Sequence, residues 1–112
     1  VEIISPIDSS QRCKVHALID TGARISVLPA KILSHFENLP YKYLKVRSFT
    51  GELQALKSTS VHFCFGSMTV PDVETIFIDQ DRAILGRNIL KDTVVLLDGP
   101  QEIAKIWFKK QQ

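Results

Sequence analysis

Residues 17–23 read Ala-Leu-Ile-Asp-Thr-Gly-Ala, an apolar segment that runs into an acid, a small hydroxyl residue and a glycine. Glycine adopts backbone conformations that other residues avoid, and it lets another segment approach closely. The pattern therefore predicts a strand that delivers Asp20 onto a turn at Gly22. Taken alone, the same residues also fit an ordinary Asp-x-Gly turn, because a single short motif often matches by chance.

A second motif follows at residues 83–90, which read Ala-Ile-Leu-Gly-Arg-Asn-Ile-Leu. Apolar residues again run into a glycine, Gly86, before a polar pair and the start of a helix. By itself this motif fits a buried strand followed by a helix. The two motifs in this order are more specific than either one alone.

Outward from these motifs, glycines and prolines separate short apolar segments, a pattern typical of an all-β barrel or sandwich. Pro71 places the start of its strand at an edge or a bulge. Residues 94–97 are a continuous apolar run that predicts a buried strand. Helix is expected only at residues 29–36, with Pro29 in the first helical position, and at residues 87–91. Strands are predicted at residues 15–20, 61–65, 68–78, 94–97 and 103–108, the last two forming a hairpin.

Size and charge exclude several classes of protein. The chain has 112 residues with 14 Lys and Arg against 12 Asp and Glu, a net charge of +2. This length predicts one domain over residues 1–112. The near-neutral charge argues against a nucleic-acid partner. Because no apolar run approaches the ~18 residues that span a bilayer, no membrane partner is expected.

Cysteine and histidine usage points away from disulfide and metal sites. Cys13 and Cys64 are too few for a disulfide scaffold. His16, His35 and His62 are scattered without zinc-ligand spacing, so neither a metal nor another cofactor is implied. Residue 1 is Val and no secretory segment follows it, which predicts an excised domain or a processed product. The compartment is not determined, although an intracellular or particle-associated protein is favoured over a secreted one.

The two motifs together resemble those of the retropepsins, the single-lobe aspartic proteases of retroviruses, retrotransposons and related cellular genes. The resemblance rests on residues 20–23 (Asp-Thr-Gly-Ala), 26–28 (Ser-Val-Leu) and 84–90 (Ile-Leu-Gly-Arg-Asn-Ile-Leu), and it spans about residues 10–108. It implies a single-lobe acid-protease β-barrel with one or two short helices, active as a two-fold dimer. It also implies that the second motif packs behind the catalytic loop, a structural role for Leu85, Gly86, Arg87 and Asn88.

The chemistry of this family explains why a dimer is implied. Aspartic proteases use two carboxylates about 3 Å apart that share one proton. This sequence has a single Asp-Thr-Gly, and no other Asp is followed by Thr-Gly or Ser-Gly. The resemblance therefore implies a homodimer in which Asp20 of each copy supplies one carboxylate. The implied activity is endopeptidase cleavage of extended peptides, including polyprotein processing.

The resemblance assigns further residues to the site. Thr21, Gly22 and Ser26 support the catalytic loop, although these residue types suit ordinary turn and strand chemistry equally well. Most of the residues expected to contact substrate are apolar, and an apolar stripe of this kind more often belongs to the protein core than to the wall of a specificity pocket. The hairpin around Thr50-Gly51 lies where the family places its flap, and it also fits an ordinary surface hairpin. Substrate contacts are expected from Ala23, Arg24, Ile25, Val27 and Ile84, and flap contacts from Ser48, Phe49, Thr50, Gly51, Glu52 and Leu53.

The sequence departs from the family pattern at one position beside the catalytic loop. Arg24 stands where many retroviral proteases carry an acid that pairs with the Arg of the second motif, here Arg87. Two like charges repel unless an acid lies between them. The family's ion pair is therefore not expected, and Arg24 is a candidate contact for substrate.

Two features leave alternatives open. Trp107 and Phe108 lie in the C-terminal hairpin, which is either a dimer seam or a closing piece of the monomer's own core. The leading hypothesis is an aspartic endopeptidase. The alternative is a catalytically silent module on the same fold that binds an extended peptide or dimerises.

Overall fold

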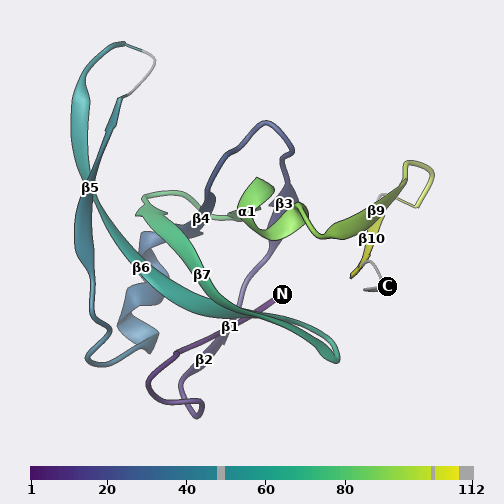
Figure 1. Cartoon of the computed structure of the whole chain (residues 1–112), viewed down its shortest axis with the longest axis horizontal. Coiled ribbons are helices and arrows are strands. Elements are labelled where there is room, and N and C mark those ends of the chain that lie inside the picture. Colours follow the sequence, from purple (N-terminus) through teal and green to yellow (C-terminus); the bar gives the residue numbers. More distant parts are fainter. Residues whose placement is uncertain (48–49, 102, 109–112) are drawn as a thin grey trace.

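The computed structural model describes residues 1–47, 50–101 and 103–108 (Figure 1). Short strands dominate, and two short helices, the 3₁₀ helix η1 (Ala30–His35) and the α-helix α1 (Arg87–Leu90), interrupt them. The predicted all-β class with one or two short helices is confirmed. The strands are β1 (Glu2–Ile4), β2 (Arg12–Lys14), β3 (Ala17–Ile19), β4 (Ser26–Pro29), β5 (Lys42–Arg47), β6 (Leu53–Phe65), β7 (Met68–Ile78), β8 (Ala83–Leu85), β9 (Thr93–Asp98) and β10 (Ile103–Phe108).

Most of the strands described form one curled sheet. Its order is β2-β1-β6-β7-β4-β8-β3, and β5 pairs with β6 beside this path. The β9–β10 hairpin forms a separate two-stranded sheet. In Figure 1 the β5–β6 hairpin extends away from the curled sheet on one side, and the β9–β10 hairpin lies on the other. The sheet thus carries two hairpins that reach out from its body.

The pairing of β3, β4 and β8 brings the two sequence motifs together. β3 lies parallel to β8, with Ile19 opposite Leu85. On its other side, β8 pairs antiparallel with β4, with Ile84 opposite Val27. Parallel strands present their carboxyl ends at the same edge of a sheet. Asp20, which follows β3, therefore lies beside Gly86, which follows β8.

The core lies where the curled sheet folds over the two helices. Ile3, Leu28, Phe63 and Ile89 are buried there, and they come from β1, β4, β6 and α1. Burial alternates along part of β6, where Val61 and Phe63 are buried and His62 is not, because successive side chains of a strand point to opposite faces. All four residues of β4 are buried, so neighbouring parts of the chain cover both of its faces. Burial of these side chains supplies the main favourable term in folding.

Two predicted elements differ from the structure. Pro29 is not the first helical residue: its ψ of 130° is extended and it ends β4, before η1 begins at Ala30. The ring fixes φ alone, so Pro29 fits a strand end as well as a helix start. Residues 94–97 do form a strand, but it is not a buried one, since Leu96 is 51% and Leu97 71% exposed. Within the described part of the chain, β9 pairs with β10 alone, and this two-stranded sheet leaves the side chains of Leu96 and Leu97 open to solvent.

Of the two positions predicted for Pro71, an edge or a bulge, the structure shows a bulge. The register between β6 and β7 shifts between Val61 and Phe63, opposite Pro71. Asp72 has a φ of 52°, in the left-handed region, and its N–H donates to His62 Nδ1 at 3.1 Å. A proline cannot donate to the strand ladder, so the chain bends past it and re-pairs on the far side.

The two cysteines lie on the strands that flank β1. Cys13 pairs with Ile3 and Cys64 with Glu2, and both thiols are free. Burial raises the pKa of the Cys13 thiol. Among the residues that the structure describes, no helix has the length and apolar character needed to cross a membrane.

The core predicts a clear contrast between two aromatic substitutions. Phe63→Ala should lower the free energy of unfolding by about 3–5 kcal/mol, because it leaves a cavity in the core. The control, Tyr43→Ala, truncates a ring that is 61% exposed and should cost less than about 1.5 kcal/mol. Urea denaturation at one protein concentration measures both. Equal losses would contradict the placement of the core.

Candidate active site

Asp20 lies on a tight turn between β3 and β4. Its backbone N–H donates to the Leu85 carbonyl at 3.1 Å, and its own carbonyl accepts the Ala23 N–H at 3.1 Å. Its Oδ1 accepts the Gly22 N–H at 2.9 Å. The Asp20 residue is exposed in this chain. The turn therefore presents a carboxylate to solvent from a backbone that is bonded to the second motif.

Gly22 packs closely against the carboxylate of Asp20. A Cβ at this position would lie 3.2 Å from Asp20 Oδ1, tighter than most side-chain contacts. An alanine would crowd the oxygen that the Gly22 N–H holds. The glycine of the Asp-Thr-Gly motif thus leaves room for the Asp20 carboxylate and donates a hydrogen bond to it.

Gly86 is required by the backbone behind the turn. A Cβ at Gly86 would lie 2.7 Å from the Ile25 carbonyl carbon and oxygen and 2.9 Å from the Ala23 oxygen. Its φ of −91° suits any residue, so the restriction is one of space. The Arg87 N–H donates to the Ala23 carbonyl at 2.7 Å. The second motif therefore packs directly against the loop that follows Asp20.

A buried hydrogen-bond network joins the same two segments. Ser26 is fully buried, and its Oγ donates to Asn88 Oδ1 at 2.7 Å while accepting the Gly86 N–H at 3.0 Å. The Ser26 N–H also donates to Asn88 Oδ1, at 3.1 Å. Asn88 Nδ2 donates to the Glu74 carbonyl of β7 at 2.7 Å. Each buried polar group in this set has a partner, which is the condition for such groups to stabilise a fold.

The expected substrate residues lie on two adjoining segments. Ala23 and Ile25 are half-buried in the loop, and Ile84 is half-buried on β8. Val27 stands opposite Ile84 but is only 6% exposed, so neighbouring strands cover it in this chain. Thr21 is exposed and makes no hydrogen bond within the described part of the chain.

Sequence reasoning missed several residues near these positions. Ile76 of β7 pairs with Val27 and is buried, but the predicted strand at 68–78 did not indicate which face it occupies. Leu44 and Val46 form a half-buried face of β5. The alternation of apolar and charged residues at 42–47 could have identified this strand and this face.

The hairpin expected near Thr50-Gly51 is present between β5 and β6. The last pair of its ladder joins Arg47 and Leu53. Gly51 has a φ of 86°, in the left-handed region that glycine favours, and its carbonyl accepts a hydrogen bond from Arg47 Nη1 at 2.9 Å. Thr50, Glu52 and Leu53 are exposed. The predicted tip residues Ser48 and Phe49 lie outside the described residues.

A family model described as aspartyl protease matches residues 6–89 of the chain. The match runs from the β1–β2 connection into α1, so it contains the first motif, all but the last residue of the second motif, and the β5–β6 hairpin. Comparison with curated proteins and with solved structures gave no match.

The close packing at Gly86 predicts a site-specific loss of stability. Gly86→Ala should destabilise the fold by about 1–3 kcal/mol, because its Cβ would meet backbone atoms that cannot move aside freely. Gly99→Ala is the matched control, since a Cβ there meets nothing within 4 Å. Thermal unfolding of both variants provides the measurement. A Gly86→Ala protein as stable as the Gly99→Ala protein would contradict the packing described here.

Proposed function

Since the chain belongs to the aspartyl protease family, we propose that it is a homodimeric aspartic endopeptidase with Asp20 of each copy at its active site. The observation that carries the proposal is the single Asp-Thr-Gly, whose carboxylate stands exposed at the end of β3. The reaction needs two carboxylates that share a proton. One chain supplies one such motif, and a two-fold axis beside Asp20 supplies the second.

The proposed reaction divides two roles between the paired carboxylates. The ionised Asp20 takes a proton from a water molecule, whose oxygen attacks the scissile carbonyl carbon. The protonated Asp20 of the other copy gives its proton to the carbonyl oxygen. The tetrahedral intermediate collapses when its C–N bond breaks: the carboxyl that took the water proton gives it to the leaving nitrogen, and the ionised Asp20 of the other copy takes a proton from a hydroxyl of the intermediate, which restores the shared proton. Like charges this close do not ionise together easily, which keeps the shared proton in place.

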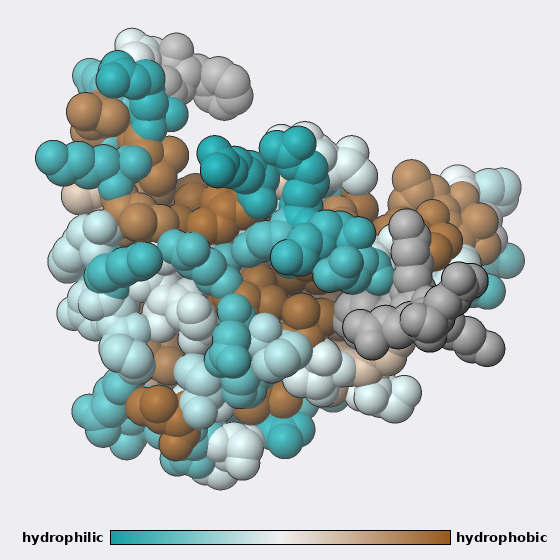
Figure 2. All heavy atoms as spheres, viewed as in Figure 1, coloured by the Kyte–Doolittle hydropathy of each residue, from teal (hydrophilic) through white to brown (hydrophobic). Residues whose placement is uncertain are grey.

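The C-terminal hairpin is the proposed dimer seam. Leu96, Leu97, Ile103 and Trp107 are between 43% and 71% exposed there. Figure 2 shows apolar atoms gathered at the β9–β10 end of the molecule. A groove of about 600 Å³ continues this surface toward β3, with Leu18, Leu97 and Ile103 among its lining residues. An exposed apolar surface of this kind favours an interface over a closed monomer core.

The β5–β6 hairpin is proposed to act as the flap. It extends from the sheet (Figure 1) and carries apolar side chains on one face, with Leu44 and Leu56 paired across its two strands. Closing such a hairpin over an extended peptide excludes water from the reacting carbonyl. The Arg47 contact to Gly51 stabilises the tip.

The catalytic assignment predicts a specific loss of cleavage. Asp20→Asn should reduce peptide cleavage by at least about 10²–10⁴-fold, because an amide can neither take nor give the shared proton. A diverse peptide mixture, digested at roughly pH 4 to 7 and read by mass spectrometry, measures the cuts. Asp92→Asn is the matched control, since Asp92 precedes a Thr but no Gly.

A folded Asp20→Asn protein that still cleaves would overturn the catalytic assignment. Absence of cleavage by the folded wild type at every concentration would favour the silent peptide-binding module instead.

If the β9–β10 hairpin is the dimer seam, a substitution there should disrupt the dimer and leave the fold of each copy intact. Leu97→Glu should convert the dimer to a monomer without unfolding it, because Leu97 is 71% exposed and faces no core. Sedimentation measures the mass, and cleavage across a dilution series measures the activity. Ile7→Glu, at a side chain that is 55% exposed on the β1–β2 connection, is the control. A Leu97→Glu protein that stays dimeric would place the seam elsewhere.

A further inference from the structure

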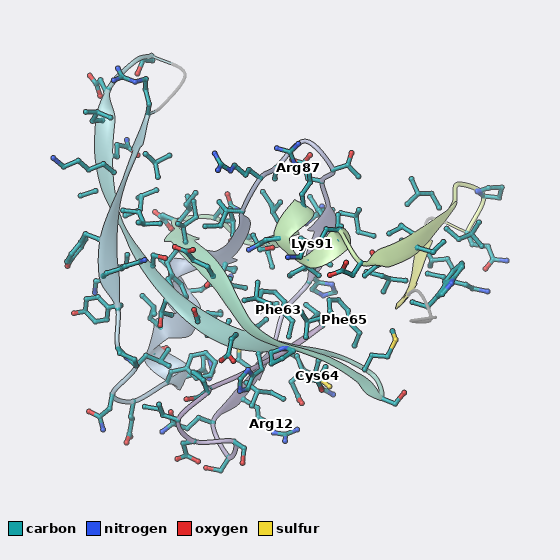
Figure 3. All side chains as sticks on the ribbon, viewed as in Figure 1. Arg12, Phe63, Cys64, Phe65, Arg87 and Lys91 are labelled. Atoms are coloured by element: carbon teal, nitrogen blue, oxygen red, sulfur yellow. The ribbon has the colours of Figure 1, made fainter. Side chains whose placement is uncertain are left out.

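Two arginines lie on backbone segments that meet at the turn carrying Asp20. The Arg87 N–H donates to the carbonyl of Ala23, the residue before Arg24. Gly86, the residue before Arg87, is packed against the Ile25 backbone on the other side of Arg24. Figure 3 shows Arg87 at the start of α1, where this helix meets the β3–β4 loop. The backbones of Arg24 and Arg87 are therefore held together by the contacts that position Asp20.

Neither guanidinium has an acidic partner in the described part of the chain. The ion pairs there join Arg12 to Glu2, Lys31 to Asp81, Lys42 to Glu74 and His62 to Asp72. Both Arg24 and Arg87 are exposed. Asp20 is the acid nearest to Arg24 along the chain, and its Oδ1 accepts a hydrogen bond from the Gly22 N–H.

Two positive charges on adjoining backbone segments attract an anion more strongly than one does. Guanidinium groups present paired N–H donors that match the two oxygens of a carboxylate. The two side chains thus carry the charge and the donor groups that a carboxylate subsite needs.

We propose that Arg24 and Arg87 bind an acidic side chain of the peptide substrate, within a few residues of the bond that Asp20 cleaves. The inference rests on the proposed protease function, because it places this subsite beside the peptide cleft. The substrates are then extended polypeptides with hydrophobic residues at the cleaved bond and an Asp or Glu nearby.

Binding to the Asp20→Asn protein tests the subsite without cleavage. The probes are fluorescent ten-residue peptides with hydrophobic residues at their centre. Each peptide carries one Glu at a different flanking position, and each is compared with a second peptide that has Gln at that position. At one or two positions the Glu peptide should bind about tenfold more tightly than its Gln partner. Added salt should weaken that preference.

Arginine variants in the same background assign the preference to residues. Arg24→Gln and Arg87→Gln should each reduce the Glu preference, and Arg24→Glu should shift it toward a Lys peptide. Arg82→Gln is the control. Arg82 is also exposed, but it lies just before the first residue of β8, whereas Arg87 lies beyond the last. Equal binding of Glu and Gln peptides, or a preference that survives both Gln variants, would overturn the proposal.

Two further outcomes separate this inference from the function on which it rests. Wild type that cleaves Glu and Gln peptides equally, in an Asp20-dependent way, would leave the protease standing and remove the subsite. If Arg24→Gln weakened the dimer in sedimentation and left peptide selectivity unchanged, the counter-ion would belong to the second copy, and the subsite would again be refuted.

Discussion

The contact between Gly86 and the backbone of Ala23 and Ile25 is the constraint on which the rest of the site depends. It leaves no room for a Cβ, so two segments of main chain meet directly. Hydrogen bonds from Ser26 to Asn88 and from Gly86 to Ser26 hold this contact in register. Asp20 is bonded through its N–H to Leu85, one residue before Gly86. The position of the acid is therefore determined by residues from both motifs.

The same packing explains how a short chain can take part in demanding chemistry. A chain of this length buries a limited fraction of its surface, and it does not build two walls of a cleft from one copy. Here the curled sheet carries one Asp-Thr-Gly carboxylate, and the β5–β6 and β9–β10 hairpins lie on either side of it. In the proposed dimer, the β9–β10 hairpin contacts the second copy and the β5–β6 hairpin covers the substrate. The exposed apolar residues of β9 and β10 have a place in that assembly.

Local patterns predicted local structure well and packing less well. The bulge at Pro71 and the hairpin at Thr50-Gly51 follow from residues with restricted or permissive backbones. The prediction of a buried strand at residues 94–97 was wrong, because an apolar run does not say whether anything covers it. The aspartyl protease family and its all-β fold were both recognised correctly from the two motifs.

The sequence by itself determined the family, the turn that carries Asp20 and the presence of one such acid in the chain. These properties depend on short runs of residues whose backbone preferences act locally. Only the tertiary structure decided that Ser26 bonds to Asn88 and that the Arg87 backbone bonds to Ala23, the residue before Arg24. Those relations join segments far apart in the chain. They arise from the parallel pairing of β3 with β8 and from the close approach at Gly86, which no local pattern specifies.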